Sequence, residues 1–226
     1  MELSIRKISG FIISLALLNC VLANAQDTIR YPVNAMKGVR IGFDVSKFAM
    51  PLIYKGNPLG IEVTADVHVK DNFFATAEAG WVKLELQMPD FRYWSSGYFG
   101  KLGTDYNLLK SRRPFNNDIV YGGLRYAFST FSHQADQINM QGYFWPNASG
   151  LNFPKYTMQA HWLELLLGVK AEVLKNLYVS LTFRFKFIVS APKDNYSKPY
   201  LIPGYGHGNE NFAIGLNYYI SYNIHF

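Results

Sequence analysis

The last segment of the chain alternates strictly between two kinds of residue, and this pattern constrains the fold more than any other feature. In "NFAIGLNYYISYNIHF", residues 211–226, every even position from Phe212 to Phe226 is apolar or aromatic. Most odd positions are polar or small, as in Gly215 and Ser221. Successive side chains of a β-strand point to opposite faces, so the pattern predicts a strand with one apolar and one polar face.

The same alternation occurs in seven earlier segments, which predicts eight strands. These segments span residues 38–48, 59–69, 72–86, 97–109, 118–131, 159–173 and 177–190. All reach the length of about nine to eleven residues that a tilted membrane strand needs. In the third segment the apolar side changes after Gly80, from Ala79 and Trp81 to Val82 and Leu84. This change predicts a β-bulge at Gly80.

The links between these segments alternate between short and long. Tight hairpin turns are predicted at "KDN" and "LKN", whereas longer links cover residues 49–58, 87–96, 132–158 and 191–210. Short turns at one end and long loops at the other are typical of bacterial outer-membrane barrels. An even number of strands then places both ends of the barrel on the short-turn, periplasmic side. The linker "KSRRPFNND" is long for a periplasmic turn.

The N-terminus predicts export of the chain. Arg6 and Lys7 precede an apolar stretch over residues 11–23, and Ala23-Asn24-Ala25 forms a small-x-small cleavage site. The apolar stretch is shorter than the roughly 20 residues of a membrane-spanning helix. We therefore expect a signal peptide over residues 1–25 that is cleaved near Ala25, a periplasmic segment over 26–37 and an outer-membrane barrel over 38–226.

Composition excludes several classes of protein. A hydrophobic fraction of 49% and a charged fraction of 17% exclude a disordered chain, and 16% aromatic residues favour strands over helices. The only cysteine, Cys20, lies in the expected signal peptide, so the mature chain has no disulfide, catalytic thiol or cysteine metal site. The net charge of +6 is consistent with scattered, solvated Lys and Arg, and no nucleic-acid partner is expected.

The volume of the side chains indicates which face of the eight strands meets solvent. An eight-stranded barrel has an interior that side chains just fill, and the many rings of the apolar face would overfill it. We therefore expect that face to contact lipid, with the membrane-facing residues Phe183, Phe185, Phe187, Tyr218, Tyr222 and Phe226. A soluble barrel or lipocalin-like carrier with an apolar interior is the architectural alternative.

The polar face is rich in glycine and small hydroxyls, which suit a narrow interior, and it carries charges of both signs. An unpaired buried charge costs several kcal/mol, so these charges must pair inside the barrel. The expected interior network consists of Arg40, Asp44, Glu62, Asp66, Glu78, Lys101, Asp105, Arg125, Glu164, Lys170, Glu172, Arg184 and Lys186.

The whole pattern resembles the small eight-stranded outer-membrane barrels of the OmpA/OmpX type, including PorT-like members. The segments "GTDYNLLKSR" and "GLRYAFSTF" are similar to an uncharacterised barrel family known only as a domain of unknown function. The resemblance implies an all-β, antiparallel, up-and-down transmembrane barrel with short periplasmic turns and long extracellular loops. In that class an alternating last strand that ends in Phe is the signal for the barrel-assembly machinery, and "GLNYYISYNIHF" matches it.

No motif specifies catalysis or metal binding. Ser132, His133 and Asp136 are close in sequence, but an adjacent Ser and His at a strand end point apart, and no nucleophile elbow surrounds Ser132. The other histidines lack ligand spacing. We therefore expect no catalytic residue, metal or cofactor, with a lipid-modifying enzyme or a narrow channel as alternatives. The glycine-rich "GYGHGNE" at 204–210 is expected to be a flexible loop tip.

The expected external loops are rich in aromatic residues. The candidate contact residues are Tyr93, Trp94, Tyr143, Phe144 and Trp145. They are consistent with a membrane-interface girdle or with a surface that binds a protein or glycan. We expect a non-enzymatic outer-membrane barrel with a structural or interaction role, in surface binding or envelope assembly. Its partners would be outer-membrane lipid, the barrel-assembly machinery and, through the loops, a surface protein or glycan.

This assignment of faces predicts the effect of a charge in the middle of the seventh segment. The substitution Phe185→Arg should block insertion, because a charge facing lipid at the bilayer midplane costs about 2–4 kcal/mol. The amount of protein recovered in the membrane fraction checks this. Normal accumulation of the variant in the membrane would show that the faces are assigned the wrong way round.

Overall fold

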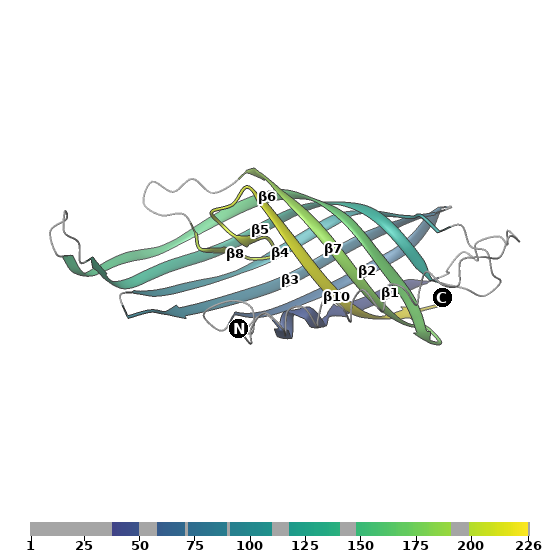
Figure 1. The fold of residues 1–226 in the computed structure, drawn as a ribbon, viewed down its shortest axis with the longest axis horizontal. Coiled ribbons are helices and arrows are strands. Elements are labelled where there is room, and N and C mark those ends of the chain that lie inside the picture. The colour runs from purple at the N-terminus through teal and green to yellow at the C-terminus, as the bar shows by residue number, and fades with distance from the viewer. Residues whose placement is uncertain are drawn as a thin grey trace, which may run out of the picture. The chain divides into compact units, whose positions relative to one another are not determined.

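Eight antiparallel strands close into a barrel in the computed structural model, which describes residues 38–49, 58–70, 72–89, 91–109, 118–140, 148–190 and 199–225 (Figure 1). Each barrel strand pairs with the next along the chain, and the last pairs with the first. The fold class of an all-β, up-and-down, eight-stranded barrel is thereby confirmed. The expected signal peptide and the segment 26–37 lie outside the described residues.

The barrel strands follow one another along the chain. Their bounds are β1 (Val39–Asp44), β2 (Leu59–Lys70), β3 (Phe73–Gln87), β4 (Arg92–Asn107), β5 (Ile119–Met140), β6 (Ala148–Leu174), β7 (Leu177–Ser190) and β10 (Phe212–Ile224). A 3-10 helix, η1 (Val45–Ala49), follows β1, and β8 (Leu201–Ile202) pairs with β9 (Gly206–His207) as a separate hairpin. Among the described residues, no helix combines the length and apolar character needed to cross a membrane.

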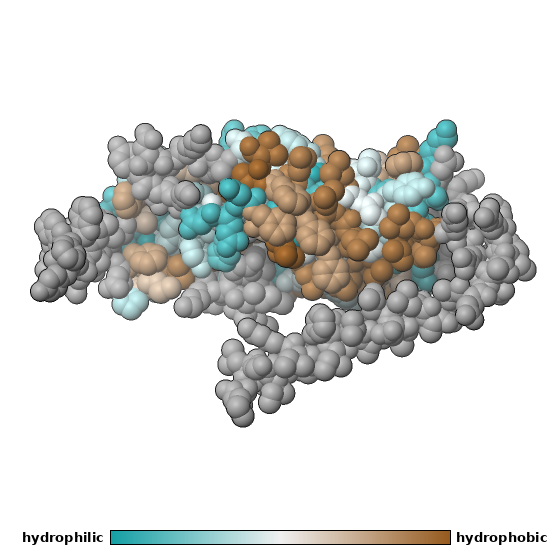
Figure 2. Space-filling view, turned by 45° about the horizontal axis from the view of Figure 1, so that its top comes forward, coloured by the Kyte–Doolittle hydropathy of each residue, from teal (hydrophilic) through white to brown (hydrophobic). Residues whose placement is uncertain are grey.

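The alternating sequence pattern becomes two faces of the barrel wall. On β7, Phe183 is 45% exposed on the outside, whereas the next residue, Arg184, is 1% exposed on the inside. The outward positions of all strands carry most of the exposed large apolar side chains. Figure 2 shows such residues gathered across the middle of the visible face, with hydrophilic residues toward its left side. The wall is therefore apolar outside and charged inside over much of its area.

The first strand is shorter than the sequence pattern predicts. Pairing of β1 with β10 ends at Asp44, so the expected length of at least nine residues is wrong for this strand. The Asp44 carboxylate accepts hydrogen bonds from the backbone N–H groups of Ser46 (2.9 Å) and Tyr218 (3.3 Å). A side chain that binds nearby backbone groups offers an alternative to ladder pairing. The chain consequently turns into η1, which contacts β2 and β10.

Two of the long links expected from the sequence are largely strand. The chain passes from β3 to β4 through residues 88–91, with a hydrogen bond from Met88 N to Phe91 O. β5 extends to Met140, and β6 begins at Ala148. The predicted loops at 87–96 and 132–158 are therefore wrong in extent. In these parts of the strands the outer face is polar. A strand prediction that requires one apolar outer face therefore ends before the strand does.

The β-bulge predicted at Gly80 is also wrong. Gly80 pairs regularly with Glu62 on β2 and with Phe99 on β4, without a shift in register. Val82 and Leu84, which follow, point into the barrel and are almost fully buried. The strand continues unchanged, and only the side that carries the apolar residues changes.

The hairpin β8–β9 folds into the mouth of the barrel. Leu201, Ile202 and Tyr205 are buried there in a cluster with Trp162. Burial and the nearby Glu210 carboxylate raise the pKa of Tyr205 to about 12, so its hydroxyl stays protonated and donates to the Glu210 carbonyl oxygen (2.8 Å). The prediction of a flexible tip at 204–210 is therefore wrong, because this segment has its own pairing and an apolar core to cover.

The tight interior gives a test on β4. A Cβ atom added to Gly103 would overlap the Leu124 carbonyl oxygen, whereas at Gly100 the nearest atom would be 3.9 Å away. Gly103→Ala should therefore destabilise the barrel by about 1–3 kcal/mol, as overpacking does. Gly100→Ala is the matched control and should unfold at the wild-type urea concentration in detergent micelles. Equal midpoints for both variants would contradict the close approach of β4 and β5 at Gly103.

Candidate functional site

Three glutamates meet two cations at the centre of the barrel. The Lys101 ammonium on β4 lies 2.8 Å from a Glu62 oxygen, 3.2 Å from a Glu78 oxygen and 3.8 Å from a Glu164 oxygen. The Arg184 guanidinium on β7 pairs with Glu164 and, at 2.9 Å, with Glu78. All five side chains are almost fully buried. Strands from opposite sides of the barrel are thus joined through its interior.

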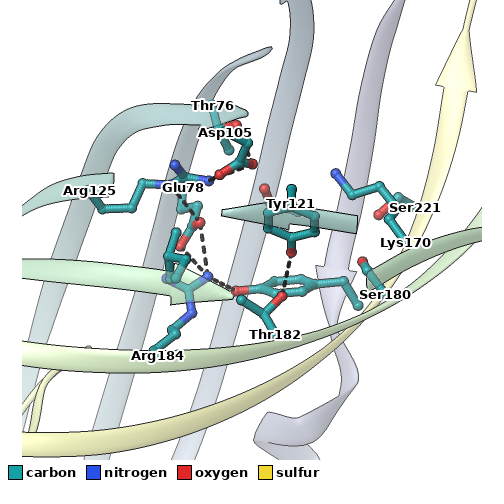
Figure 3. A pocket seen from close by; sticks show the side chains of 13 residues that line it. Thr76, Glu78, Asp105, Tyr121, Arg125, Lys170, Ser180, Thr182, Arg184 and Ser221 are labelled. Atoms are coloured by element: carbon teal, nitrogen blue, oxygen red, sulfur yellow. Dashed lines mark hydrogen bonds and ion pairs between the residues drawn. The ribbon is translucent and has the colours of Figure 1, made fainter. Parts of the chain in front are cut away.

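The network continues along β4 and β5. Glu78 lies between the guanidiniums of Arg125 and Arg184 (Figure 3). Arg125 also holds both oxygens of Asp105, at 2.7 and 2.8 Å, and Asp105 accepts a hydrogen bond from the Thr76 hydroxyl. Both contacts come from the Nη2 atom of Arg125. Hydrogen bonds between ionised groups are roughly twice as strong as neutral ones.

A second group of charges lies toward the short-turn end. Asp66 on β2 pairs with Arg40 on β1 and, at 2.7 Å, with the Lys170 ammonium on β6. The Arg40 guanidinium lies over the Tyr178 ring, 4.9 Å from its centroid, and the Lys170 ammonium lies 5.4 Å from the Tyr121 centroid. Aromatic faces attract cations, so these inward rings support the charges as well as filling space.

Several polar partners of the network were not predicted from the sequence. Lys47 on η1 reaches Glu62 at 2.9 Å, and Tyr219 accepts a hydrogen bond from Arg184 and donates one to Glu62. Trp162 donates to Glu164 at 2.7 Å. Tyr219 and Trp162 occupy inward positions of their strands, so the strand parity contained a signal for them. The sequence contains no such signal for Lys47, because this residue belongs to a helix that the alternation does not predict.

Three predicted network residues differ from the rest in their surroundings. Glu172 is only half-buried, and its side chain accepts a hydrogen bond from Asn176 N at the β6–β7 turn. The Asp44 carboxylate, at the end of β1, accepts a hydrogen bond from the backbone N–H of Tyr218 on β10. Lys186 is buried and donates to the carbonyl oxygens of Gly204 (2.8 Å) and Tyr205 (2.9 Å), which holds the β8–β9 hairpin.

The residues predicted to face lipid lie on the outer wall as far as the structure describes them. Phe183, Phe185, Phe187, Tyr218 and Tyr222 are each at least 38% exposed on β7 and β10, and Phe226 lies outside the described residues. Only two of the five residues predicted to make loop contacts lie in the described part of the chain. Tyr93 points into the barrel mouth and Trp94 is half-buried, both on β4. Tyr143, Phe144 and Trp145 lie outside the described residues.

A small polar cavity lies within the network, lined among others by Thr76, Tyr121, Thr182 and Arg184 (Figure 3). The Tyr121 hydroxyl is 2.6 Å from the Thr182 hydroxyl, and these groups close one side of it. Its volume is about 10 Å³, roughly the smallest space that holds one water molecule. A cavity of this size suits bound water and is too small for a lipid or sugar.

The residues weighed for catalysis are not assembled into a catalytic arrangement. His133 points into the barrel and packs against Tyr93, whereas Ser132 lies on the opposite face of β5. Asp136 accepts a hydrogen bond from Gln134. Across the described ranges, no cluster of three or more His, Cys, Asp or Glu side chains has a geometry that would hold a metal ion.

Comparison with known proteins assigns the family. A model described as "Domain of unknown function (DUF6048)" matches residues 4–226. The chain belongs to this family. No curated protein matches it.

Two solved structures are similar to this barrel. A major outer membrane protein from Thermus thermophilus is 11% identical, with a TM-score of 0.48, over 83% of this chain and 98% of that one. Neisserial surface protein A is 12% identical, with a TM-score of 0.33, over 82% of this chain and 93% of that one.

The network predicts a large difference between two glutamates of β3. Glu78→Gln removes the charge that three cations share and leaves buried positive charge uncompensated, so it should destabilise the barrel by about 3–5 kcal/mol. Glu85 is exposed on the same strand, and Glu85→Gln should change stability by no more than about 0.5 kcal/mol. Denaturant unfolding in micelles measures both. A Glu78→Gln barrel as stable as the control would refute the network's role in stability.

Proposed function

We propose that this protein is a non-enzymatic barrel of the bacterial outer membrane that serves a structural or interaction role. The observation that carries the proposal is the reversed polarity of the wall. Leu102 and Ile214 are each 67% exposed outside, while Glu62, Lys101 and Arg184 are no more than 2% exposed inside. A soluble protein places these two classes of side chain the other way round.

Lipid is the environment that this surface fits. Soluble monomers seldom expose contiguous apolar patches larger than a few hundred Å². Here the outward residues of β7 from Leu177 to Val189 are apolar throughout, and those of the neighbouring β10 are apolar or aromatic. The barrel closes through the pairing of β1 with residues 219–224 of β10, and closure of the sheet is what allows strands to cross hydrocarbon. These features argue against a lipocalin-like carrier, whose apolar residues would line an internal cavity.

The interior supports a closed barrel over a channel. Eight strands leave almost no lumen, and here ion pairs fill its centre while the β8–β9 hairpin occupies its mouth. The same packing argues against an enzyme, because the cavity among the ion pairs is water-sized. The remaining roles are those of a stable membrane element, with lipid on its wall, the assembly machinery acting on β10, and a protein or glycan meeting its outer loops.

Reconstitution tests this proposal. The purified protein should require detergent for solubility, should resist carbonate extraction from vesicles, and should show no single-channel conductance in planar phosphatidylcholine bilayers. Pull-down from gently solubilised membranes would then identify partners. Recovery in the aqueous fraction without detergent would support the soluble carrier, and discrete conductance steps would support the channel. A lipid hydrolase activity abolished by Ser132→Ala or His133→Ala would support the enzyme.

A further inference from the structure

The apolar residues of β3 change sides part-way along the strand, although its pairing is regular. Before Gly80 the outward positions are Ala75, Ala77 and Ala79, and beyond it they are Lys83, Glu85 and Gln87. The inward positions next to Gly80 change in the opposite sense, from Thr76 and Glu78 to the buried Val82, Leu84 and Leu86, while Phe74 at the start of the strand is also buried. Around Gly80 the outer face of the strand therefore changes from apolar to polar, and the inner face changes from polar to apolar.

The neighbouring strands show the same reversal. On β4 the inward residue changes from Lys101 to Phe99, and on β6 it changes from Glu164 to Trp162. On β5 the inward Arg125 and the outward Phe128 give way to an inward Phe131 and an outward Ser132. These changes cluster around one row of paired residues, Gly80, Phe99, Ser129 and Ala160.

A reversal of polarity along continuous strands indicates a change of solvent. In hydrocarbon the outer wall must be apolar, whereas in water the apolar side chains move to the inside. We infer that the lipid–water boundary on the loop side crosses β3–β6 along the row Gly80–Phe99–Ser129–Ala160. Beyond it these strands and the β8–β9 hairpin form a module that water surrounds. The inference rests on the proposed membrane function.

Amphipathic rings lie on the outer wall close to this row. The Trp81 indole N–H donates to the Ser96 hydroxyl at 3.2 Å. Tyr98, which pairs with Trp81 across β3 and β4, is 66% exposed. The Tyr126 hydroxyl lies 2.6 Å from His161 Nδ1 on the next strand. Tyr and Trp are enriched where a membrane meets water, since one end of each ring is apolar and the other is polar.

The module has an apolar core of its own. Ile202 and Tyr205 of the hairpin region pack in one cluster with Leu84 and Phe131, and the Tyr205 and Trp162 ring centroids are 5.7 Å apart. The Ser95 hydroxyl donates to the Leu201 carbonyl oxygen. This core adjoins the ion pairs: Trp162 donates to Glu164, the Lys101 ammonium lies 5.0 Å from the Phe99 ring centroid, and Lys186 donates to the Tyr205 carbonyl oxygen. The outward charges of the module would be costly against lipid but are ordinary in water.

Labels on one face of β3 test the position of the boundary. Ala79→Cys, Lys83→Cys and Gln87→Cys, each in a Cys20→Ser background, place a thiol on exposed outward positions. Each is labelled with nitrobenzoxadiazole and reconstituted into phosphatidylcholine vesicles. A nitroxide on the lipid acyl chain should remove most of the fluorescence at position 79 and little at 83 or 87. A water-soluble nitroxide on both sides of the membrane should show the opposite order.

The outcomes separate this inference from the proposed function. Acyl-chain quenching at 83 and 87 as strong as at 79 would overturn the boundary and leave the membrane barrel intact. Absence of acyl-chain quenching at all three positions, with strong aqueous quenching, would overturn the membrane barrel itself. Urea unfolding midpoints of the three labelled variants, which should match one another, control for altered folding.

Discussion

Charge compensation inside a narrow barrel is the constraint on which the rest of the structure depends. Lys101 and Arg184 form ion pairs with glutamates from three different strands, so the ion pairs fix the strands relative to one another. A shift of one residue in the register of any strand would turn its inward charges to the outside of the barrel and its outward apolar residues inward. The regular pairing of β3 with β4 and of β7 with β10 is consistent with so strict a requirement.

Two layers of different chemistry fill the barrel. One layer contains the ion pairs of Lys101 and Arg184. The other, around Trp162 and Ile202, is apolar and is closed by the β8–β9 hairpin. The two layers meet where the outer wall also changes character. The inferred passage of the strands from lipid to water would account for the inner and the outer change together.

The alternation of the sequence was enough to predict the eight strands, their antiparallel order and the opposite exposure of neighbours such as Phe183 and Arg184. It was also enough to place most of the buried charges. The alternation did not predict the apolar layer around Trp162 and Ile202. A period of two separates the two faces of a strand but does not show which solvent each face meets. For this reason the pattern predicts a bulge at Gly80, where the strand pairs regularly. Nor did it predict Lys47, whose role depends on the early end of β1 at Asp44.

The central claim is that lipid covers the alternating apolar face and that the opposite face is sealed from it. Leu165 and Leu166 are adjacent on β6, 52% and 5% exposed, and point to opposite sides of the wall. In methyl-labelled, otherwise deuterated protein in protonated detergent micelles, nuclear Overhauser effects from acyl-chain protons should reach the Leu165 methyl groups and be absent at Leu166. Acyl-chain contacts at Leu166, or water contacts alone at Leu165, would contradict this account of the fold.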